Sequence, residues 1–561
     1  MWRHLAILAL TCFLTFFAGL GRGAISDSDE AFYAEASREM VQSGDWLTPR
    51  YNYEPRFQKP ILYYWLAATA LRLAGVSEAA ARLPSALAGF GLVLVTYACG
   101  RRWLRPRVGL IAGLIVATNF GYFMIARLAL PDLPLALFIC MAIWAALEAL
   151  RPAAGSVPTS TARRWLLLGS AAAGLGFLTK GPVGAAVPAL VVTGCVLLVR
   201  DWRTPGRAVP FSWRDLALAA AVFVLMALPW YAAMAGQYGL AYLQRFFVHE
   251  NLQRFFTDRY NERRTLGLYL PIVLGGLLPW SPFMWPWIAA AVRITRGRAT
   301  VQPDEWRLVL WAGLPLAFYS LSVGQQPRYI LPILPPLALL LARSMSWRLE
   351  RAEAAHQRVE RTLAWSATAG GLVLLALGFL LHRGKPLLFA LNPALDRAGT
   401  LAIVAAGLAV LAVAWLGRPR HLVGTMAAAS TVTLLALHYS VYSAAGLEPV
   451  QRMAALVAQH RQADEPVGAH RVLARNLIFY TGARQTELPD TAAVVQFLRS
   501  PRRVLCVVGE RELGDVEARL GVPSVHLAGI RYSNPARLRL RSLLWPDPAR
   551  DLETVFLVTN R

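Results

Sequence analysis

The stretch that decides the fold is residues 5–35, which read LAILALTCFLTFFAGLGRGAISDSDEAFYAE. Residues 5–20 carry no charged side chain and form an apolar run close to the length of a helix that crosses a membrane. The residues that follow are polar and include Asp27, Asp29 and Glu30. A membrane helix that opens directly into an acidic loop predicts chemistry at one surface of the membrane.

Apolar runs of this kind recur along the chain. Of its 561 residues, 56% are hydrophobic and only 16% are charged, whereas an ordinary soluble domain has roughly 25% charged residues. This composition excludes a soluble globular protein. We predict about thirteen spans, at residues 5–20, 80–100, 108–124, 131–149, 165–179, 183–199, 216–234, 267–291, 307–322, 328–345, 363–382, 399–416 and 422–443. The sequence therefore predicts a polytopic α-helical membrane protein.

The net charge of +24 is a signal of topology rather than of nucleic-acid binding. The arginines gather in short loops between apolar runs, which is the pattern of cytoplasmic loops in membrane proteins. These loops are residues 101–107, 151–164, 200–215, 292–306, 343–362 and 417–421. With the N-terminus in the cytoplasm, all of them fall on the cytoplasmic side. Two long polar loops, 21–79 and 235–266, and the C-terminal part of the chain then lie on the opposite, outer face.

The chain divides into a membrane part, residues 1–446, and a C-terminal part, residues 447–561. Beyond 446 the apolar runs stop, and short strand-like and helical patterns alternate. The strand-like runs are Arg502–Val508 and Thr554–Val558, and the helical patterns are Val450–His460 and Thr491–Leu498. We predict a small α/β domain that lies on the outer face and is large enough for a core of its own.

The first outer loop holds an acidic pair with two possible roles. Ser26 or Ser28 can cap a helix, and acids in its first turn then favour the positive end of the helix dipole. Alternatively, Asp29 and Glu30 sit at the membrane surface, where partial loss of water raises the basicity of a carboxylate. Tyr33 lies four residues after Asp29, on the same helical face. The residues alone leave both interpretations open.

Three further charges lie close to predicted span ends. Lys59 begins an aromatic stretch, residues 57–66, that is too short to span and is typical of the membrane interface. Its amine either reaches out to water or neutralises a lipid phosphate. Arg127 and Asp132 bracket a short outer connection, where they form an ion pair with each other or line a site.

The second outer loop combines aromatic residues with charged ones. Glu250, Asn251 and Arg254 have helical spacing. A guanidinium among aromatic rings holds phosphate in a fork geometry, which makes Arg254 a candidate phosphate ligand. His249 is a weaker candidate for a metal site, because a catalytic zinc ordinarily has three protein ligands.

A polar hairpin after residue 323 adds two candidates, Arg328 and Tyr329, which line the same cavity or anchor the hairpin at the interface. The turn at residues 179–182 lacks the spacing of a phosphate loop, and we interpret it as an outer-face turn. No nucleotide-binding or metalloprotease motif is present in the sequence.

Taken together, these motifs resemble the GT-C superfamily of integral-membrane glycosyltransferases, and within it the lipid A aminoarabinose transferase family, which is similar to protein O-mannosyltransferases. The matching elements are Asp29-Glu30 with Tyr33-Ala34-Glu35 and Arg38-Glu39-Met40, Gly44-Asp45-Trp46, Lys59-Pro60 with Tyr64-Trp65, Ala81-Arg82-Leu83-Pro84, Arg127 with Asp132, Thr179-Lys180-Gly181-Pro182, Glu250-Asn251 with Gln253-Arg254-Phe255, Leu278-Pro279-Trp280-Ser281-Pro282 and Tyr329-Ile330-Leu331-Pro332. They follow the order of the family over more than half of the chain.

The resemblance implies a catalytic carboxylate in the first outer loop and basic residues that hold the phosphate of a polyprenyl-phosphate sugar donor. The site residues predicted from the resemblance and the patterns above are Asp29, Glu30 and Asp132 as catalytic groups, Lys59, Arg254 and Tyr329 as ligands of the donor phosphate, and Tyr33, Arg127, Glu250, Asn251 and Arg328 around the substrates. The family also implies a divalent ion, often zinc, with His249 as its ligand. This chain has Gln58 where the acidic partner is expected. No nucleotide cofactor is expected.

The predicted function is transfer of a sugar from undecaprenyl phosphate to lipid A, with inversion, at the periplasmic face of the bacterial inner membrane. The specific sugar that we predict is 4-amino-4-deoxy-L-arabinose, whose amine masks lipid A charge and lowers the binding of cationic antimicrobial peptides. Alternative acceptors are another lipid or protein hydroxyls. A transporter would place charges near the membrane midplane in repeated halves, and a membrane scaffold would leave the outer-loop motifs unexplained.

Overall fold

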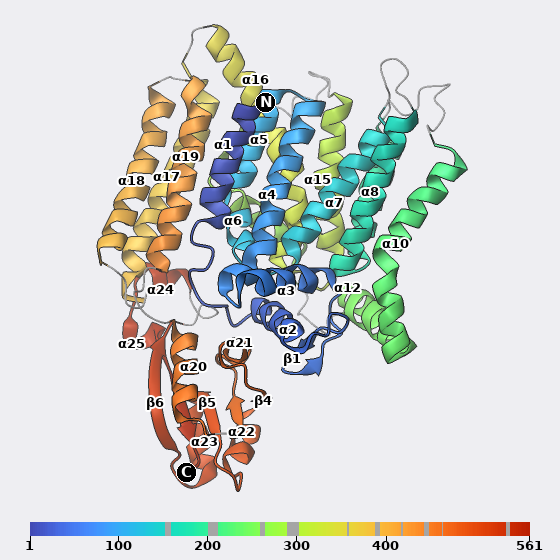
Figure 1. Cartoon of the computed structure of the whole chain (residues 1–561). Helices are drawn as coiled ribbons and strands as arrows, with labels where there is room; N and C mark the ends of the chain where they lie inside the picture. Colours follow the sequence, from blue (N-terminus) through green and yellow to red (C-terminus); the bar gives the residue numbers. More distant parts are fainter. Residues whose placement is uncertain are drawn as a thin grey trace.

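A bundle of long helices with a small sheet domain at one end is the architecture of the chain in a computed structural model (Figure 1). The structure describes residues 1–151, 159–199, 211–257, 264–288, 302–355, 358–387, 393–416, 419–442, 448–462, 464–533 and 539–561.

Among these residues, seven helices are long and apolar enough to cross a membrane, or eight if one bent pair counts as a single span. The seven are α4 (Glu78–Trp103), α7 (Asp132–Ala149), α10 (Trp213–Tyr238), α16 (Leu334–Ala354), α17 (Arg361–Gly384), α18 (Pro393–Trp415) and α19 (Pro419–Val441). Other helices of the bundle are α1 (Trp2–Cys12) with η1 (Phe13–Phe17), α8 (Thr159–Lys180), α9 (Val183–Leu198), α13 (Tyr269–Gly276) and α15 (Pro303–Leu321). The polytopic helical fold is confirmed, but the predicted count of thirteen spans is not.

The bent pair is α5 (Pro106–Thr118) and α6 (Phe120–Ala126), which meet at 57°. Asn119 causes the break. Its side-chain amide donates to the carbonyls of Ile115 and Val116 at 3.0 and 2.8 Å, and its Oδ1 accepts from the N–H of Tyr122 at 2.9 Å. The side chain therefore closes one helix and caps the next.

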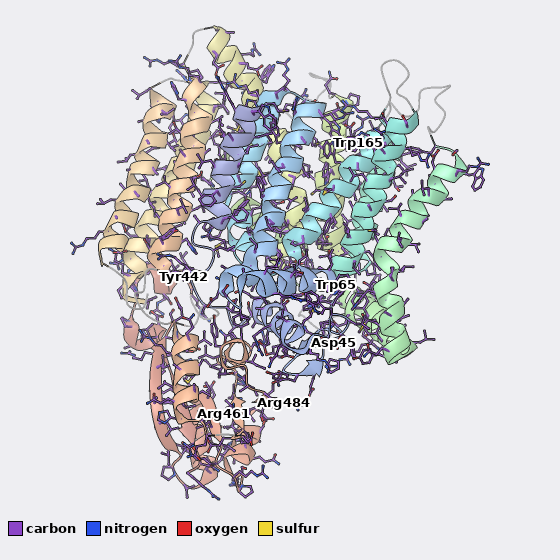
Figure 2. All side chains as sticks on the ribbon, viewed as in Figure 1. Asp45, Trp65, Trp165, Tyr442, Arg461 and Arg484 are labelled. Carbon is purple, nitrogen blue, oxygen red and sulfur yellow. The ribbon has the colours of Figure 1, made fainter. Side chains whose placement is uncertain are left out.

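The outer-loop segments gather at the end of the bundle that faces the sheet domain (Figure 1). They form α2 (Asp29–Ser43), the hairpin strands β1 (Arg50–Tyr51) and β2 (Glu54–Pro55), α3 (Leu62–Ala74), α11 (Leu240–Gln244), the π-helix η3 (Arg245–Gln253) and α12 (Arg254–Phe256). The helix α3 lies across the ends of the long helices, and the N-terminus lies at the opposite end (Figure 1). Asp45 and Trp65 mark the loop end and Trp165 the far end (Figure 2).

The C-terminal domain is built on a five-stranded mixed sheet with the order β4-β3-β5-β7-β6. Strand β3 runs parallel to β4 and β5, and β7 runs antiparallel to β5 and β6. The strands are β3 (Val467–Ala469), β4 (Gln485–Glu487), β5 (Leu505–Gly509), β6 (Val525–Tyr532) and β7 (Glu553–Thr559). The helices are α20 (Pro449–His460), α21 (Leu477–Thr481), α22 (Thr491–Leu498), α23 (Glu510–Leu520), α24 (Leu540–Leu544) and α25 (Pro548–Asp551).

Both faces of the central strand β5 are covered. Leu505 and Val507 pack into one apolar cluster, whereas Cys506 and Val508 pack into another on the opposite face. The four elements predicted in this domain are confirmed as β5, β7, α20 and α22. The predicted boundary at residues 446 and 447 lies outside the described residues.

The C-terminal domain holds the first outer loop by hydrogen bonds. The phenol of Tyr480 accepts from the N–H of Ile25 at 2.7 Å. Asn52 donates to the carbonyl of Gln485 at 2.7 Å and accepts from the N–H of Gln485 at 2.8 Å. These bonds join residues more than 400 positions apart and fix the loop that carries the acidic pair.

Candidate active site

A cavity of about 420 Å³ lies where the two outer loops meet the bundle. It contains seven of the predicted site residues, namely Lys59, Asp132, Glu250, Asn251, Arg254, Arg328 and Tyr329. The rest of its wall is largely apolar and includes Phe247, Leu252, Phe255, Phe256, Phe318 and Tyr319. The cavity therefore has a charged region beside an apolar one.

A chain of ion pairs crosses the charged region. Asp132, the first residue of α7, has its Oδ1 2.6 Å from Nζ of Lys180 and its Oδ2 3.2 Å from Nε of Arg328. Arg328 in turn pairs with Asp29 of the first outer loop. The Lys180 amine also lies 4.6 Å from the ring centre of Tyr329, a cation–π contact. One arginine thus connects two carboxylates from different parts of the sequence.

Asp29 is the more accessible of these two carboxylates. It is the first residue of α2, and Ser28 caps that helix by accepting from the N–H of Glu30 at 3.3 Å. The side chain of Asp29 is 45% exposed, against 3% for Asp132. Burial opposes ionisation of Asp29, but the ion pair with Arg328 and the charges of Lys180 and Lys59 outweigh it, so its pKa lies below the ordinary value. Asp29 is ionised at neutral pH.

The cavity has more cations than anions in its wall. Lys59, Lys180, Arg254 and Arg328 line it together with only two carboxylates, Asp132 and Glu250. Within the described part of the chain, Lys59 has no hydrogen bond or ion pair. Burial, and then the charges of Arg254 and Lys180, lower the pKa of Lys59 to about 7. A bound anion would relieve this crowding of positive charge.

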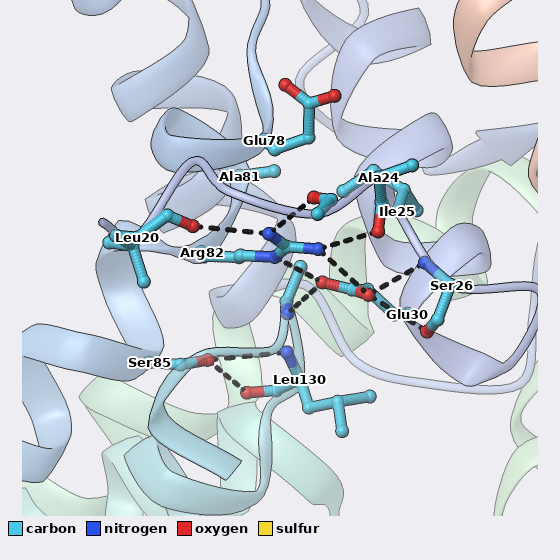
Figure 3. Close-up of polar contacts among 12 residues, drawn as sticks. Leu20, Ala24, Ile25, Ser26, Glu30, Glu78, Ala81, Arg82, Ser85 and Leu130 are labelled. Carbon is cyan, nitrogen blue, oxygen red and sulfur yellow. Dashed lines mark hydrogen bonds and ion pairs between the residues drawn. The ribbon is translucent and has the colours of Figure 1, made fainter. Parts of the chain in front are cut away.

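Glu30 does not line this cavity, and its contacts are those of a buried structural ion pair. Its carboxylate is fully buried and pairs with Nε of Arg82 at 2.8 Å (Figure 3). It also accepts from the N–H of Ala129 at 3.0 Å and from the N–H and hydroxyl of Ser26, both at 2.9 Å. Arg82 donates in addition to four backbone carbonyls, those of Leu20, Arg22, Gly23 and Ala24. The pair is a structural brace for the loop.

Two predicted cavity residues lie elsewhere. Arg127 donates to the carbonyl of Thr15 at 2.7 Å and to that of Ala18, where it closes the end of the first helix. Tyr33 is buried against Tyr63 and Tyr64, with ring centres 5.3 and 5.4 Å away. Neither residue lines the cavity. Arg127 was predicted from its proximity in the sequence to Asp132, and Tyr33 from its spacing after Asp29.

The residues around His249 do not fit a metal ion held by the protein. Nδ1 of His249 lies 2.9 Å from Oε1 of Gln253, and the nearby Asn251 donates to the carbonyl of Phe246. No group of three or more His, Cys, Asp or Glu side chains in the described ranges is arranged to hold a metal. A structural or catalytic zinc ordinarily has at least three protein ligands. The zinc stays a prediction.

Lys180 is the cavity residue that sequence reasoning missed. It ends α8, and Gly181 follows with a φ of 81°, which turns the chain toward α9. The sequence offers a signal, since the chain has only three lysines and this one directly follows an apolar run. Its partner Asp132 is 48 residues away and could not be paired with it from spacing alone.

Comparison with known proteins agrees with this architecture. The model of the dolichyl-phosphate-mannose-protein mannosyltransferase family matches residues 7–241. An undecaprenyl phosphate-alpha-4-amino-4-deoxy-L-arabinose arabinosyl transferase from Edwardsiella ictaluri is 34% identical over 346 residues, covering 61% of this chain and 58% of that protein. One of the same description from Pseudomonas paraeruginosa is 33% identical over 384 residues, covering 67% and 65%. The chain spans about three-fifths of the length of these curated relatives.

A solved structure extends the likeness to the whole chain. The crystal structure of ArnT from Cupriavidus metallidurans bound to undecaprenyl phosphate matches with a TM-score of 0.73 and 24% identity. The match covers 99% of this chain and 98% of that one, so the two share a fold that includes the C-terminal domain. By sequence the chain is similar to these arabinosyl transferases of the membrane, and it has the same fold as ArnT.

Proposed function

We propose that the protein transfers 4-amino-4-deoxy-L-arabinose from undecaprenyl phosphate to lipid A at the periplasmic face of the inner membrane. The observation that carries this proposal is the cavity itself, where an excess of cations lies beside an apolar wall and a partly exposed, ionised carboxylate. A lipid-linked phosphate needs such cations and such a wall. The similarity to undecaprenyl phosphate-alpha-4-amino-4-deoxy-L-arabinose arabinosyl transferases supports the choice of sugar and carrier.

The cations of the cavity would act on the leaving group. Transfer breaks the bond between C1 of the sugar and the phosphate oxygen, and the electron pair stays on that oxygen. Lys59 and Arg254 line the region where a phosphate would sit, and donors held in place stabilise the charge that develops there. Tyr329 lines the same wall, with Lys180 over its ring.

Asp29 would act on the acceptor. Its carboxylate does not line the cavity but is fixed by Arg328 of the cavity wall, which is held by Asp132, so it presents a positioned negative group next to that arginine. The acceptor oxygen forms the new bond to C1 from the side opposite the leaving phosphate, which inverts that carbon. If the acceptor is a hydroxyl, Asp29 takes its proton; a phosphate acceptor has none to lose and requires alignment alone.

The periplasmic orientation is part of the proposal. The arginine-rich connection between α4 and α5 lies at the end of the bundle opposite the outer loops (Figure 1). Under the positive-inside rule that end faces the cytoplasm. The cavity and the C-terminal domain then face the periplasm, where a lipid-linked donor is used without a nucleotide.

Mass spectrometry of lipid A tests the function. The chain would be expressed in a bacterium that lacks its own aminoarabinose transferase but still makes the loaded donor. We expect one aminoarabinose to be added to lipid A by the wild type and none by Asp29→Asn. Glu54→Gln is the matched control, because Glu54 is an exposed carboxylate of the same loop, paired only at the surface with Arg484 (labelled in Figure 2). No addition by a correctly inserted wild-type protein would contradict the proposal.

A further inference from the structure

Glu250 is the one carboxylate of the cavity wall that the proposed reaction has not yet used. It lies in the π-helix η3, is buried, and faces the cavity. Its Oε2 is 3.9 Å from Nη1 of Arg254, one helical turn further on, and its charge also acts on Lys59. An acid therefore stands among the very cations that would hold a phosphate. Irregular π-helical turns of this kind are frequent at functional sites.

An acid at this position does not serve the binding of phosphate. Like charges repel, and a carboxylate near a phosphate weakens its binding unless something positive lies between them. The other carboxylate of the wall, Asp132, has a separate task, since its two oxygens face Lys180 and Arg328 and it fixes the arginine that holds Asp29. Glu250 lies outside that chain of ion pairs.

A cationic substituent on the sugar supplies a reason for the carboxylate of Glu250. The amine of aminoarabinose must leave water and enter a cavity that already has four cations in its wall. A further positive charge is unfavourable there unless it pairs with a carboxylate. A pyranose ring carries its C1 oxygen and its C4 nitrogen on opposite sides. Arg254 and Glu250 both line the cavity, and their charged groups approach to 3.9 Å, so the two reach the same part of its wall.

We propose that Glu250 selects the sugar by pairing its carboxylate with the C4 amine, while Arg254 holds the phosphate at C1. When Arg254 binds the phosphate, its pairing with Glu250 weakens, and the Glu250 carboxylate turns toward the C4 amine. This inference rests on the proposed function and deepens it, because it names the group on the substrate that the protein recognises. A neutral pentose has no group that the carboxylate prefers over water.

Two donors distinguish the amine from the rest of the substrate. Undecaprenyl phosphate carrying aminoarabinose would be compared with the same lipid carrying arabinose, which has a hydroxyl in place of the amine, with purified full-length protein and lipid A. For the wild type we expect a kcat/KM that is higher for the aminated donor. In Glu250→Gln the value for the aminated donor should fall about tenfold or more, the size expected when a hydrogen bond between charged groups is lost, while the value for the neutral donor stays within about twofold.

The control variant and the contradicting results are specific. Lys59→Ala should lower kcat/KM for both donors by the same factor, because both carry the same phosphate. If Glu250→Gln also lowers both equally, or changes neither, Glu250 only supports Arg254 and the inference is overturned. The wild-type comparison needs no variant, and equal use of both donors would overturn the inference even if Glu250→Gln does not fold. A wild type that uses neither donor would overturn the proposed function, and this inference with it.

Discussion

Asp29 and Glu30 are neighbours in the sequence and both pair with an arginine from a distant segment, yet the two pairs differ in kind. The carboxylate of Glu30 is completely buried, and each of its oxygens accepts several hydrogen bonds, from Arg82, Ala129 and Ser26 (Figure 3). The Asp29 side chain is 45% exposed and has one protein partner, Arg328, among the bonds seen in the described residues.

The difference lies in what remains free to meet a substrate. Successive residues on a helix point about 100° apart, so α2 directs one acid into the loop brace and the other toward the cavity. A carboxylate whose lone pairs are all used holds structure together. One that keeps an open side can bind or accept a proton. Both pairs join a carboxylate to an arginine, and saturation with hydrogen bonds separates the structural acid from the catalytic candidate.

The largest effect is expected from a substitution that breaks the Asp29–Arg328 pair. Asp29→Asn removes the charge but keeps the shape, so kcat should fall about 10²–10⁴-fold, as for loss of a positioned acid–base group. The melting temperature in detergent should change little, because the side chain is partly exposed. Transfer assays on purified protein and a thermal melt measure the two quantities. Near-normal kcat in a folded variant would remove Asp29 from the mechanism.

Substitutions in the Glu30–Arg82 pair should have the opposite effect and lower stability more than kcat. Glu30→Gln leaves the buried Arg82 without its counter-charge, which typically costs about 3–5 kcal/mol of folding stability. We expect a much lower melting temperature and poor yield, with kcat per folded molecule reduced far less than in Asp29→Asn. Arg82→Lys tests the same brace from its other side, since a lysine cannot reach four carbonyls and a carboxylate at once. Unchanged melting in both variants would show that the brace is dispensable.

The pH dependence of KM for the donor tests the role of Lys59 in the cavity. Lys59 has a pKa of about 7, so it loses its charge as the pH rises through that value, while the donor phosphate stays anionic. KM for the donor should be flat below about pH 7 and rise above it, toward tenfold per pH unit. In Lys59→Arg the rise should be absent up to pH 9, because a guanidinium keeps its charge. The same inflection in Lys59→Arg would assign the titration to another group.

The smallest effect is expected at Glu39, in the C-terminal half of α2. Glu39 is buried, accepts from the N–H of Tyr53 at 2.9 Å, and lies one turn from the acid Glu35. Burial, and then the charge of Glu35, raise its pKa. The folded state therefore binds this proton more tightly than the unfolded state does, and stability falls as the pH rises above the ordinary carboxyl range of roughly 4.

Replacing this acid should remove that loss. Glu39→Gln should melt a few degrees above the wild type at pH 8 and at nearly the same temperature at pH 5. Thermal melts of both proteins across this range provide the measurement. A variant that is less stable at pH 8 would mean that the ionised carboxylate is tolerated in the fold.

The sequence predicted the class of fold and much of the site, for reasons that are local. Apolar runs are long and unmistakable, and the cap at Ser28 follows from a serine before two acids. Lys59, Arg254 and Tyr329 were placed near one another because motifs of a family hold their order in the chain, and all three line the cavity. Their roles as phosphate ligands stay predictions.

What the sequence could not give depends on contacts across the fold. The choice between Asp29 and Glu30 requires knowing that Arg82 comes from α4 and Arg328 from the hairpin after α15. Lys180 finds Asp132 only when α7 and α8 pack. Strands β3 and β4 have three residues each, too short for an alternating pattern to stand out. The order of motifs can be read from the sequence, whereas the number of hydrogen bonds that a carboxylate accepts depends on the folded structure.

The hydrogen bonds between the first outer loop and the C-terminal domain have a consequence for how the protein is made. Tyr480 is synthesised 455 residues after its partner Ile25. The loop that carries Asp29 therefore lacks these bonds while the membrane helices between residues 25 and 480 are inserted. Segments that are far apart in the order of synthesis are therefore joined late, and the proposed activity is expected to appear only after the C-terminal domain has been made.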